Sequence, residues 1–151
     1  MNKKIKNAQV TEYNGINFKS KTEVMVYKTL INNGFEVFYE PTSYIVWKGY
    51  KPKKSFYRPD KEGILKLDDV KVRDITYTPD FITSYKDLPI IIEVKGFSND
   101  VYPYKRKLFR KYLEDLDQNS MYFEIHTKRQ LLQAIEIIKN YDSNRDNETN
   151  V

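Results

Sequence analysis

Residues 77–96 read YTPDFITSYKDLPIIIEVKG, and the architecture predicted for the whole chain depends on them. Two runs of β-forming residues stand on either side of a turn near Lys86-Asp87. The first run carries Asp80 and the second carries Glu93, at places where a strand that only packs in a core would carry aliphatic side chains. We therefore predict an antiparallel hairpin that carries chemistry as well as structure.

The two acidic side chains are expected to face each other across this hairpin. Strand side chains alternate between faces, so Glu93 and Lys95 share one face of the second strand. With the turn at Lys86-Asp87, Asp80 lies about opposite Glu93, and directly opposed side chains are roughly 5 Å apart. Two carboxylates at that distance repel each other unless a cation lies between them. Mg²⁺ removes the repulsion, because it binds a few carboxylate oxygens together with waters and phosphate.

These residue types suit the hydrolysis of phosphodiester bonds. A divalent ion held by Asp80 and Glu93 can activate a water and offset the charge that builds on the phosphate. Lys95 can orient that water, act as a base or stabilise the pentavalent phosphate. Asp74 shares the strand face of Asp80 and is a lesser candidate ligand. An oxygen-only site is what remains for a metal, since the chain has no cysteine and a single histidine.

A short motif in this hairpin resembles that of a known nuclease superfamily. Pro79-Asp80, followed by Glu93-Val94-Lys95, resembles the PD-(D/E)XK motif shared by many restriction enzymes, phage exonucleases and junction resolvases. The resemblance implies that Asp80 and Glu93 are metal ligands and that Val94 contributes its backbone carbonyl. It also implies that Lys95 is catalytic and that the cofactor is Mg²⁺, for which Mn²⁺ would substitute.

The resemblance extends upstream, where the stretch from Gly15 to Glu23 looks like the acidic helix of several superfamily members. Ser20-x-x-Glu23 is a capping-box pattern, and a helix is predicted from Ser20 to Asn32. Glu23 shares the apolar face of this helix with Tyr27. Two interpretations stand: Glu23 only reciprocates the cap of Ser20, or it is an additional acidic residue of the active site. The second is our prediction.

Composition favours a polyanionic partner. The 151 residues carry a net charge of +5, and aromatic residues make up 15 % of them. The alternative is an ordinary lysine-rich surface from an AT-biased genome. No apolar run is long enough to span a membrane, and residues 1–6 lack the apolar core of a signal peptide. We expect no membrane partner and an intracellular, cytoplasmic protein, which if phage-encoded would act in the host cytoplasm.

Between Lys48 and Arg73, cations alternate with aromatic residues and prolines. One interpretation is a loop or hairpin that follows a phosphate backbone, with rings available to stack on unpaired bases. The other is an ordinary solvated excursion with its aromatic side chains tucked beneath it. Both interpretations stand at this point.

The strongest candidate for a DNA-binding surface is a helix predicted from Val101 to Leu116. Its predicted apolar stripe consists of Tyr104, Leu108, Tyr112 and Leu116. Its clustered cations are Lys105, Arg106, Lys107, Arg110 and Lys111. Because the helix begins shortly after Lys95, these cations are predicted to bind DNA, with Ser20 and Lys21 as further contacts; the alternative is a solvated helix face.

The predicted fold class is α/β, in the order αβββαβα. This is a mixed sheet with a catalytic β-hairpin flanked by helices, as in the restriction-endonuclease-like core that the resemblance implies. Residues 1–14 are expected to be a basic N-terminal arm, residues 15–140 a single nuclease-like domain, and residues 141–151 a polar, disordered tail.

The predicted function is a Mg²⁺-dependent DNA endonuclease. Small size and no recognisable target-reading domain favour a structure-selective enzyme for branched or junction DNA, resembling phage-type Holliday junction resolvases of DNA recombination. Cutting two strands would require a homodimer. One alternative is a catalytically silent DNA-binding or inhibitory protein on the same fold, and another is an unrelated basic α/β domain with acidic pairs at its surface. The intact Asp80, Glu93 and Lys95 argue against the silent alternative.

Overall fold

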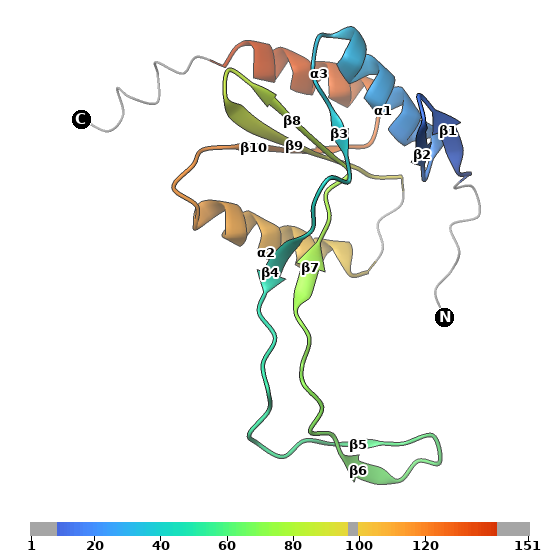
Figure 1. Cartoon of the computed structure of the whole chain (residues 1–151), viewed down its shortest axis with the longest axis vertical. Coiled ribbons are helices and arrows are strands. Elements are labelled where there is room, and N and C mark those ends of the chain that lie inside the picture. Colours follow the sequence, from blue (N-terminus) through green and yellow to red (C-terminus); the bar gives the residue numbers. More distant parts are fainter. Residues whose placement is uncertain (1–8, 97–99, 142–151) are drawn as a thin grey trace.

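The computed structural model describes residues 9–96 and 100–141, which form a mixed α/β fold (Figure 1). A four-stranded sheet in the order β10-β9-β8-β3 lies at its centre. Its strands are β3 (Phe38–Tyr39), β8 (Phe81–Tyr85), β9 (Leu88–Val94) and β10 (Met121–Ile125). Strand β10 runs parallel to β9, whereas β8 is antiparallel to both β9 and β3. The α/β class predicted from the sequence is confirmed.

The described residues form three α-helices: α1 (Lys21–Asn32), α2 (Tyr102–Glu114) and α3 (Lys128–Lys139). Helices α1 and α3 lie on one side of the central sheet and α2 lies on the other (Figure 1). Along the chain, these helices and the strands of the central sheet follow the order α1-β3-β8-β9-α2-β10-α3. Within the part of the chain that the structure describes, no helix is long and apolar enough to cross a membrane.

The two faces of β9 pack into separate apolar clusters. Ile90, Ile92 and Val94 join the cluster that includes residues of α1 and α3. Ile91 instead joins the cluster of Tyr77, Tyr102 and Phe109 on the α2 side. This confirms the predicted alternation of β9 and places Glu93 on the α2 side. Each large side chain buried in this way contributes about 1.5 to 3 kcal/mol.

Local sequence signals explain the first helix and the hairpin. Ser20 Oγ accepts a hydrogen bond from the N–H of Glu23 at 3.1 Å, so α1 begins where predicted. In the β8–β9 turn, Lys86 and Asp87 have φ angles of 48° and 65° between the paired residues Tyr85 and Leu88. Positive φ at both positions is the type I′ geometry whose twist suits a two-residue hairpin, and the predicted turn is confirmed.

A second hairpin precedes α1. Strands β1 (Thr11–Tyr13) and β2 (Ile16–Phe18) pair antiparallel. Their turn is Asn14-Gly15, a dipeptide that signals such hairpins, with φ angles of 53° and 76°. The chain therefore enters the fold at Thr11, within the segment 1–14 that we expected to be a separate arm. Residues 1–8, and the predicted tail beyond Tyr141, lie outside the described residues.

A long projection, which we call the arm, spans residues 48–74. At its base β4 (Tyr44–Trp47) pairs antiparallel with β7 (Ile75–Tyr77). At its far end β5 (Tyr57–Pro59) and β6 (Leu65–Leu67) form a hairpin well away from the central sheet (Figure 1). The two chains of the arm approach closely at Gly49, where a Cβ would lie 2.1 Å from the carbonyl oxygen of Val72. Any side chain at that position would clash with backbone.

The apolar stripe predicted for α2 is correct at Tyr112, which packs against the cluster on the α2 side, and wrong at Tyr104 and Leu116. Tyr104 is 68 % exposed and Leu116 is 45 % exposed, whereas Tyr102 and Phe109 are buried. Residues spaced by four advance about 40° around a helix at each step, so a repeat of four does not stay on one face. Tyr102 and Phe109 are seven residues apart, close to two full turns, and face the sheet together.

A short strand follows α1 and joins the central sheet beside β8. The described strand β3 contains only Phe38 and Tyr39, although Phe35 and Val37 are buried in the core.

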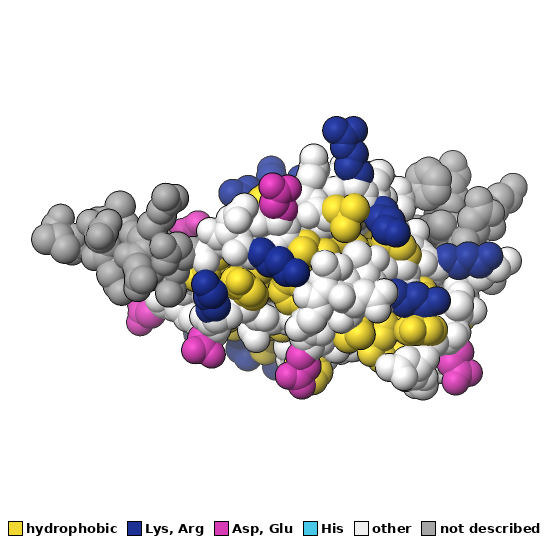
Figure 2. All heavy atoms as spheres, turned by 90° about the horizontal axis from the view of Figure 1, so that it is seen from above, with side chains coloured by type: hydrophobic (Ala, Val, Ile, Leu, Met, Phe, Trp, Pro, Cys, Tyr) yellow, Lys and Arg dark blue, Asp and Glu magenta, His cyan; other side chains and the backbone are white. Residues whose placement is uncertain are grey.

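Figure 2 shows the opposite end of the molecule from the arm, where lysine and arginine side chains stand apart from one another among apolar and uncharged surface.

Candidate active site

The predicted catalytic residues meet where β8 begins and β9 ends. Phe81 of β8 pairs with Ile92 of β9. Because the two strands are antiparallel, Asp80, which precedes Phe81, lies beside Glu93, which follows Ile92. Both side chains belong to residues that are buried, with exposed fractions of 9 % for Asp80 and 5 % for Glu93. The structure thus brings together the two acidic residues of the hairpin as the sequence predicted.

Asp80 has an electrostatically unfavourable position. Its Oδ2 accepts a hydrogen bond from the N–H of Val94 at 2.7 Å. Burial and the negative charge of Glu93 nevertheless raise the pKa of the Asp80 carboxyl to about 7, with a smaller contribution from Glu23, while Val94 and Lys95 oppose the shift. A cation beside Asp80 would favour the charged carboxylate and so oppose the shift.

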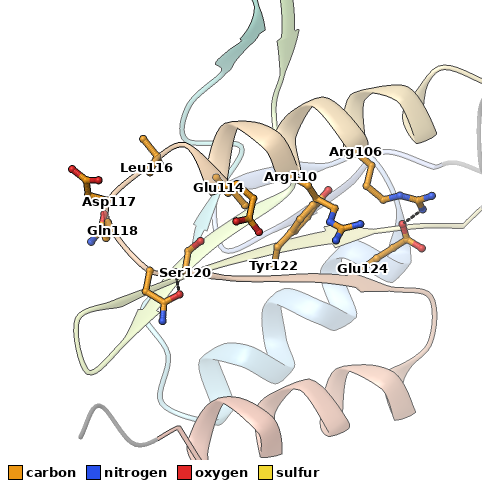
Figure 3. A pocket seen from close by; sticks show the side chains of 11 residues that line it. Arg106, Arg110, Glu114, Leu116, Asp117, Gln118, Ser120, Tyr122 and Glu124 are labelled. Carbon is orange, nitrogen blue, oxygen red and sulfur yellow. Dashed lines mark hydrogen bonds and ion pairs between the residues drawn. The ribbon is translucent and has the colours of Figure 1, made fainter. Parts of the chain in front are cut away.

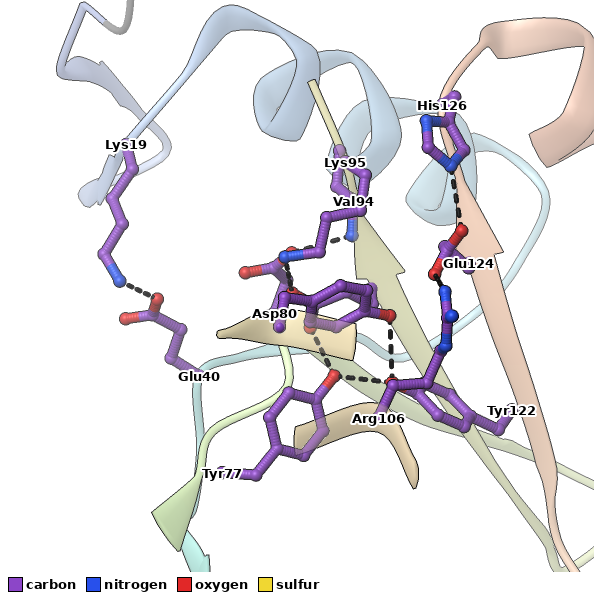
Figure 4. A network of polar contacts seen from close by, with 12 residues as sticks. Lys19, Glu40, Tyr77, Asp80, Val94, Lys95, Arg106, Tyr122, Glu124 and His126 are labelled. Atoms are coloured by element: carbon purple, nitrogen blue, oxygen red, sulfur yellow. Dashed lines mark hydrogen bonds and ion pairs between the residues drawn. The ribbon is translucent and has the colours of Figure 1, made fainter. Parts of the chain in front are cut away.

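Glu93 is held from two sides by Lys95 and Tyr77, whose side chains are labelled in Figure 4. Lys95 Nζ lies 2.7 Å from Glu93 Oε1, and the Tyr77 hydroxyl donates a hydrogen bond to Glu93 Oε2. Lys95 also lies over the ring of Tyr102, 3.6 Å from its centroid. Its side chain is only 15 % exposed. Glu93 and Lys95 therefore lie on the same side of the sheet, as the alternation of β9 predicted.

Three tyrosines extend this network and were missed in the sequence analysis. Tyr77 and Tyr122 have hydroxyls 2.9 Å apart, and the hydroxyls of Tyr122 and Tyr102 are 3.2 Å apart. Burial is the main reason that the pKa of each tyrosine is raised, so all three hydroxyls stay protonated and can donate. The sequence did contain a signal for two of them: Tyr77 precedes the motif, and Tyr122 lies in the strand β10. A tyrosine buried on a strand usually needs a hydrogen-bond partner for its hydroxyl.

Glu23 comes to the same region from α1. It is buried, and its Oε2 accepts hydrogen bonds from the N–H of Lys19 and the hydroxyl of Tyr39, both at 2.8 Å. Its described partners do not include the N–H of Ser20, so Glu23 does not close the capping box that the sequence suggested. Its charge contributes to the raised pKa of Asp80. The prediction that Glu23 shares the buried face of α1 with Tyr27 is confirmed, and its role in an active site stays a prediction.

The donors available for a metal ion are few. Within residues 9–96 and 100–141, no group of three or more histidine, cysteine, aspartate or glutamate side chains is arranged to hold an ion. Asp74, the lesser candidate ligand, does not join Asp80 and instead accepts a hydrogen bond from the N–H of Gly49 at 2.7 Å, at the base of the arm. Asp80, Glu93 and the carbonyl of Val94 remain as the candidate metal ligands.

The cations predicted to bind DNA on α2 fall into two groups. Arg106 forms an ion pair with Glu124 at 2.9 Å, and Lys111 forms one with Asp115 at 2.8 Å. Such paired cations have less charge to offer a phosphate. The remaining cations have no ion-pair partner among the residues the structure describes, and they are Lys105, Lys107 and Arg110.

A hollow of about 470 Å³ lies between α2 and β10 (Figure 3). Its lining combines Arg106 and Arg110 with Glu114 and Glu124, so its charge is mixed.

Of the two further predicted DNA contacts, Ser20 uses its hydroxyl to cap α1, while Lys21 is exposed. His126 lies outside the site and pairs with Glu124 at 2.9 Å.

Comparison with known proteins adds a family to this geometry. A search of curated proteins gives no match. Residues 2–128 match the family described as Protein of unknown function (DUF1064). Because this match covers more than half of the sequence, including β8, β9 and the site between them, the chain belongs to the DUF1064 family.

Proposed function

We propose that this protein is a Mg²⁺-dependent DNA endonuclease of the PD-(D/E)XK type, selective for branched or junction DNA. The observation that carries the proposal is the meeting of Asp80, Glu93 and Lys95 at one end of the β8–β9 hairpin, in a buried environment that raises the pKa of Asp80 to about 7. Structural ion pairs also occur in proteins, but a carboxyl whose pKa is raised to about 7 by burial and by a second carboxylate is unfavourable unless it has a use.

The fold supports the same reading. The order of α1, β3, β8, β9, α2, β10 and α3 is the αβββαβα order implied by the resemblance to the nuclease superfamily. The motif occupies the antiparallel hairpin β8–β9, and β10 adds in parallel after the crossover through α2. A fold supports many functions, so the side chains of the site carry the argument.

The residues present fit a magnesium ion. Asp80, Glu93 and the carbonyl of Val94 would hold it, and the burial of two neighbouring carboxyl groups, which raises the pKa of Asp80, supports a positive charge there. When bound, the ion would activate a water and offset the charge that builds on the phosphate. Hydrolysis adds water across one P–O bond, which leaves a hydroxyl on one sugar and a phosphate monoester on the other.

The protein's own groups would orient the reacting partners. Lys95 is close enough to Glu93 to share a hydrogen bond, and its ammonium group can donate to a phosphate oxygen or to the attacking water. Tyr77 holds the second oxygen of Glu93, which limits the carboxylate to one orientation. Glu23 adds negative charge near Asp80 and thereby favours a cation there.

The experiment compares cleavage of linear duplex, nicked, flap and four-way junction DNA with Mg²⁺, with Mn²⁺ and with a chelator. We expect cleavage with either metal, fastest on a branched substrate. Asp80→Asn and Lys95→Met should each lower the rate at least 100-fold, because each removes one group of the site while keeping most of its volume. Asp87→Asn is the matched control, since Asp87 lies in the exposed turn of the same hairpin.

A catalytically silent DNA-binding protein is the second candidate. It is favoured by the saturation of Glu93, whose two oxygens are engaged by Lys95 and Tyr77 within the protein. This candidate predicts DNA binding without cleavage under every metal condition, and binding that is unchanged in Asp80→Asn and Lys95→Met. Equal cleavage by the parent and both variants would reject the proposed active site.

A further inference from the structure

The arm contains an open pocket that the proposed active site does not use. Its volume is about 590 Å³, within the range of small-molecule sites. The outgoing and returning segments of the arm are joined on one side of the pocket by reciprocal backbone hydrogen bonds between Tyr50 and Val72, both 2.9 Å long. On the other side the N–H of Asp68 donates to the carbonyl of Phe56 at 2.8 Å. Between these two bridges, Lys51 Nζ donates a hydrogen bond to the carbonyl of Asp69 at 3.0 Å, so the two segments that line the pocket are joined at three places.

The arm carries a surplus of positive charge. Between residues 48 and 74 there are nine lysines and arginines against five aspartates and glutamates. Inside the pocket, Arg58 is paired with Asp68 at 2.9 Å. Lys53, Lys54 and Lys71 also line the pocket, and they have no ion-pair partner among residues 9–96 and 100–141. Unpaired cations gathered on a projecting element attract a polyanion.

Aromatic rings line the same pocket. Tyr50 is 54 % exposed and Phe56 is 60 % exposed, although each could bury a large apolar surface. The ring of Trp47 meets that of Tyr50 edge to face, with centroids 5.9 Å apart, and so limits its movement. Rings held open to solvent beside unpaired lysines suit a ligand that combines a flat base with a phosphate.

We propose that the arm pocket binds an unpaired nucleotide of single-stranded DNA. The bases would stack on Tyr50 and Phe56, and the phosphates would lie against Lys53, Lys54 and Lys71. A base within a duplex has both faces covered by its neighbours, so the rings favour unpaired over paired DNA while the lysines do not distinguish them. Taking DNA as the ligand rests on the proposed function, and the arm would add selectivity for substrates with an unpaired segment.

The test uses the full chain carrying Asp80→Asn, which keeps DNA intact, and measures fluorescence anisotropy of labelled oligonucleotides at several salt concentrations. The probes are a single-stranded oligothymidylate, an abasic strand of the same length and a duplex. Tyr50→Ala with Phe56→Ala should weaken oligothymidylate binding by about 10- to 100-fold and leave abasic binding nearly unchanged, at the cost typical of lost stacking. Phe38→Ala is the control, because Phe38 is 52 % exposed outside the arm.

A charge series completes the test. Lys53, Lys54 and Lys71 changed together to Gln should weaken binding to both single strands and flatten the slope of log affinity against log salt by about 2, at roughly 0.7 per phosphate contact. Lys86, Lys128 and Lys139 changed to Gln are the matched control, since they remove the same charge outside the arm and should leave the slope nearly unchanged.

The outcomes separate the two proposals. Unchanged binding in both arm variants would overturn the nucleotide pocket, even if the parent protein cleaves DNA. Reduced single-strand binding without cleavage by the parent would support the pocket and reject the nuclease. The hairpin face formed by Tyr57, Pro59, Leu65 and Leu67 is exposed and could instead bind a second copy of the chain. If light scattering shows that the arm variants convert a dimer to a monomer and this accounts for the lost affinity, the nucleotide proposal fails.

Discussion

Asp80 makes the stability of the protein depend on pH. Its folded-state pKa of about 7 lies above the ordinary value of 3.8, so the folded protein holds this proton more tightly than the unfolded chain. The contribution of the protonated carboxyl is therefore fully present below a pH of about 4 and is lost as the pH rises to about 7. Above that pH, the charged carboxylate remains as a destabilising group that a bound cation would compensate.

We predict that Asp80→Asn stabilises the metal-free protein at pH 8. Asparagine keeps an oxygen for the N–H of Val94 and carries no charge to desolvate. The free energy of unfolding should rise by about 1 to 3 kcal/mol at pH 8 and change little at pH 4, within a linkage limit of about 4 kcal/mol. Urea denaturation across this pH range, in a chelator, measures the difference.

Asp87→Asn is the control for this experiment, because Asp87 is exposed and asparagine also accepts its positive φ of 65°. Added Mg²⁺ should raise the melting temperature of the parent more than that of Asp80→Asn. If the parent and Asp80→Asn show the same pH dependence of stability, the pKa of the Asp80 carboxyl is not raised in the folded protein.

Glu23 can be tested apart from its structural role. In Glu23→Gln, the amide oxygen can still accept from the N–H of Lys19 and the hydroxyl of Tyr39, so stability should change by less than about 1 kcal/mol. Cleavage should nevertheless need a higher Mg²⁺ concentration, because one negative charge near Asp80 is lost. A titration of rate against Mg²⁺ measures this effect. Glu23→Ala should cost about 1 to 3 kcal/mol by leaving two donors unpaired, and an unchanged Mg²⁺ requirement in Glu23→Gln would make the residue purely structural.

At the scale of elements, α2 has one side that packs and one that is open to solvent. The three cations without ion-pair partners, Lys105, Lys107 and Arg110, are the ones we expect to contact phosphates. Changed together to Gln, they should weaken binding to every duplex sequence alike and flatten the salt slope by about 2 to 3, at roughly 0.9 per contact. Phe109 and Tyr102 are untouched, so the melting temperature should hold.

Arg106→Gln provides the contrast within the same helix. Arg106 already pairs with Glu124, whose pKa is lowered to about 2 because hydrogen bonds from His126, Arg106 and Tyr102 outweigh its burial. Arg106→Gln should change the slope of log affinity against log salt by less than one third of the change in the triple variant. The affinity is measured at several salt concentrations on two duplexes of unrelated sequence. A larger slope change in Arg106→Gln would mean that Arg106, despite its ion pair, is the main phosphate contact of α2.

At the scale of the whole molecule, the arm should be dispensable for folding. The residues of both buried clusters lie outside residues 51–71. Tyr50 and Val72 exchange both backbone hydrogen bonds, so an Asn-Gly turn can join them in place of that segment. We expect the shortened protein to keep its free energy of unfolding within about 1 kcal/mol, because closing a shorter loop changes little entropy.

Thermal unfolding and cleavage assays check this prediction together. The shortened protein should cut duplex regions at the parental rate and lose its preference for substrates with an unpaired segment. Gly49→Val is a contrasting variant, because it introduces a clash with the backbone of Val72 and should destabilise the base of the arm. A large loss of stability on shortening would mean that the arm supports the core.

Several features could be read from neighbouring residues alone. The start of α1 follows from Ser20, whose hydroxyl meets an N–H three residues away. The β8–β9 hairpin follows from two strand-forming runs around Lys86-Asp87, and the alternation of β9 places Glu93 and Lys95 on one side. These features depend on backbone geometry that repeats over two to four residues, so sequence order is enough to specify them.

The remaining features depend on how elements pack. Tyr77, Tyr102 and Tyr122 come from β7, α2 and β10, and their hydroxyls meet only because α2 packs on the sheet face that carries Glu93. The same packing buries Phe109, which lies in the cluster on the α2 side of the sheet. Side chains far apart in sequence have no fixed distance until the sheet and helices are assembled, so their contacts, and the raised pKa of Asp80, belong to the tertiary structure.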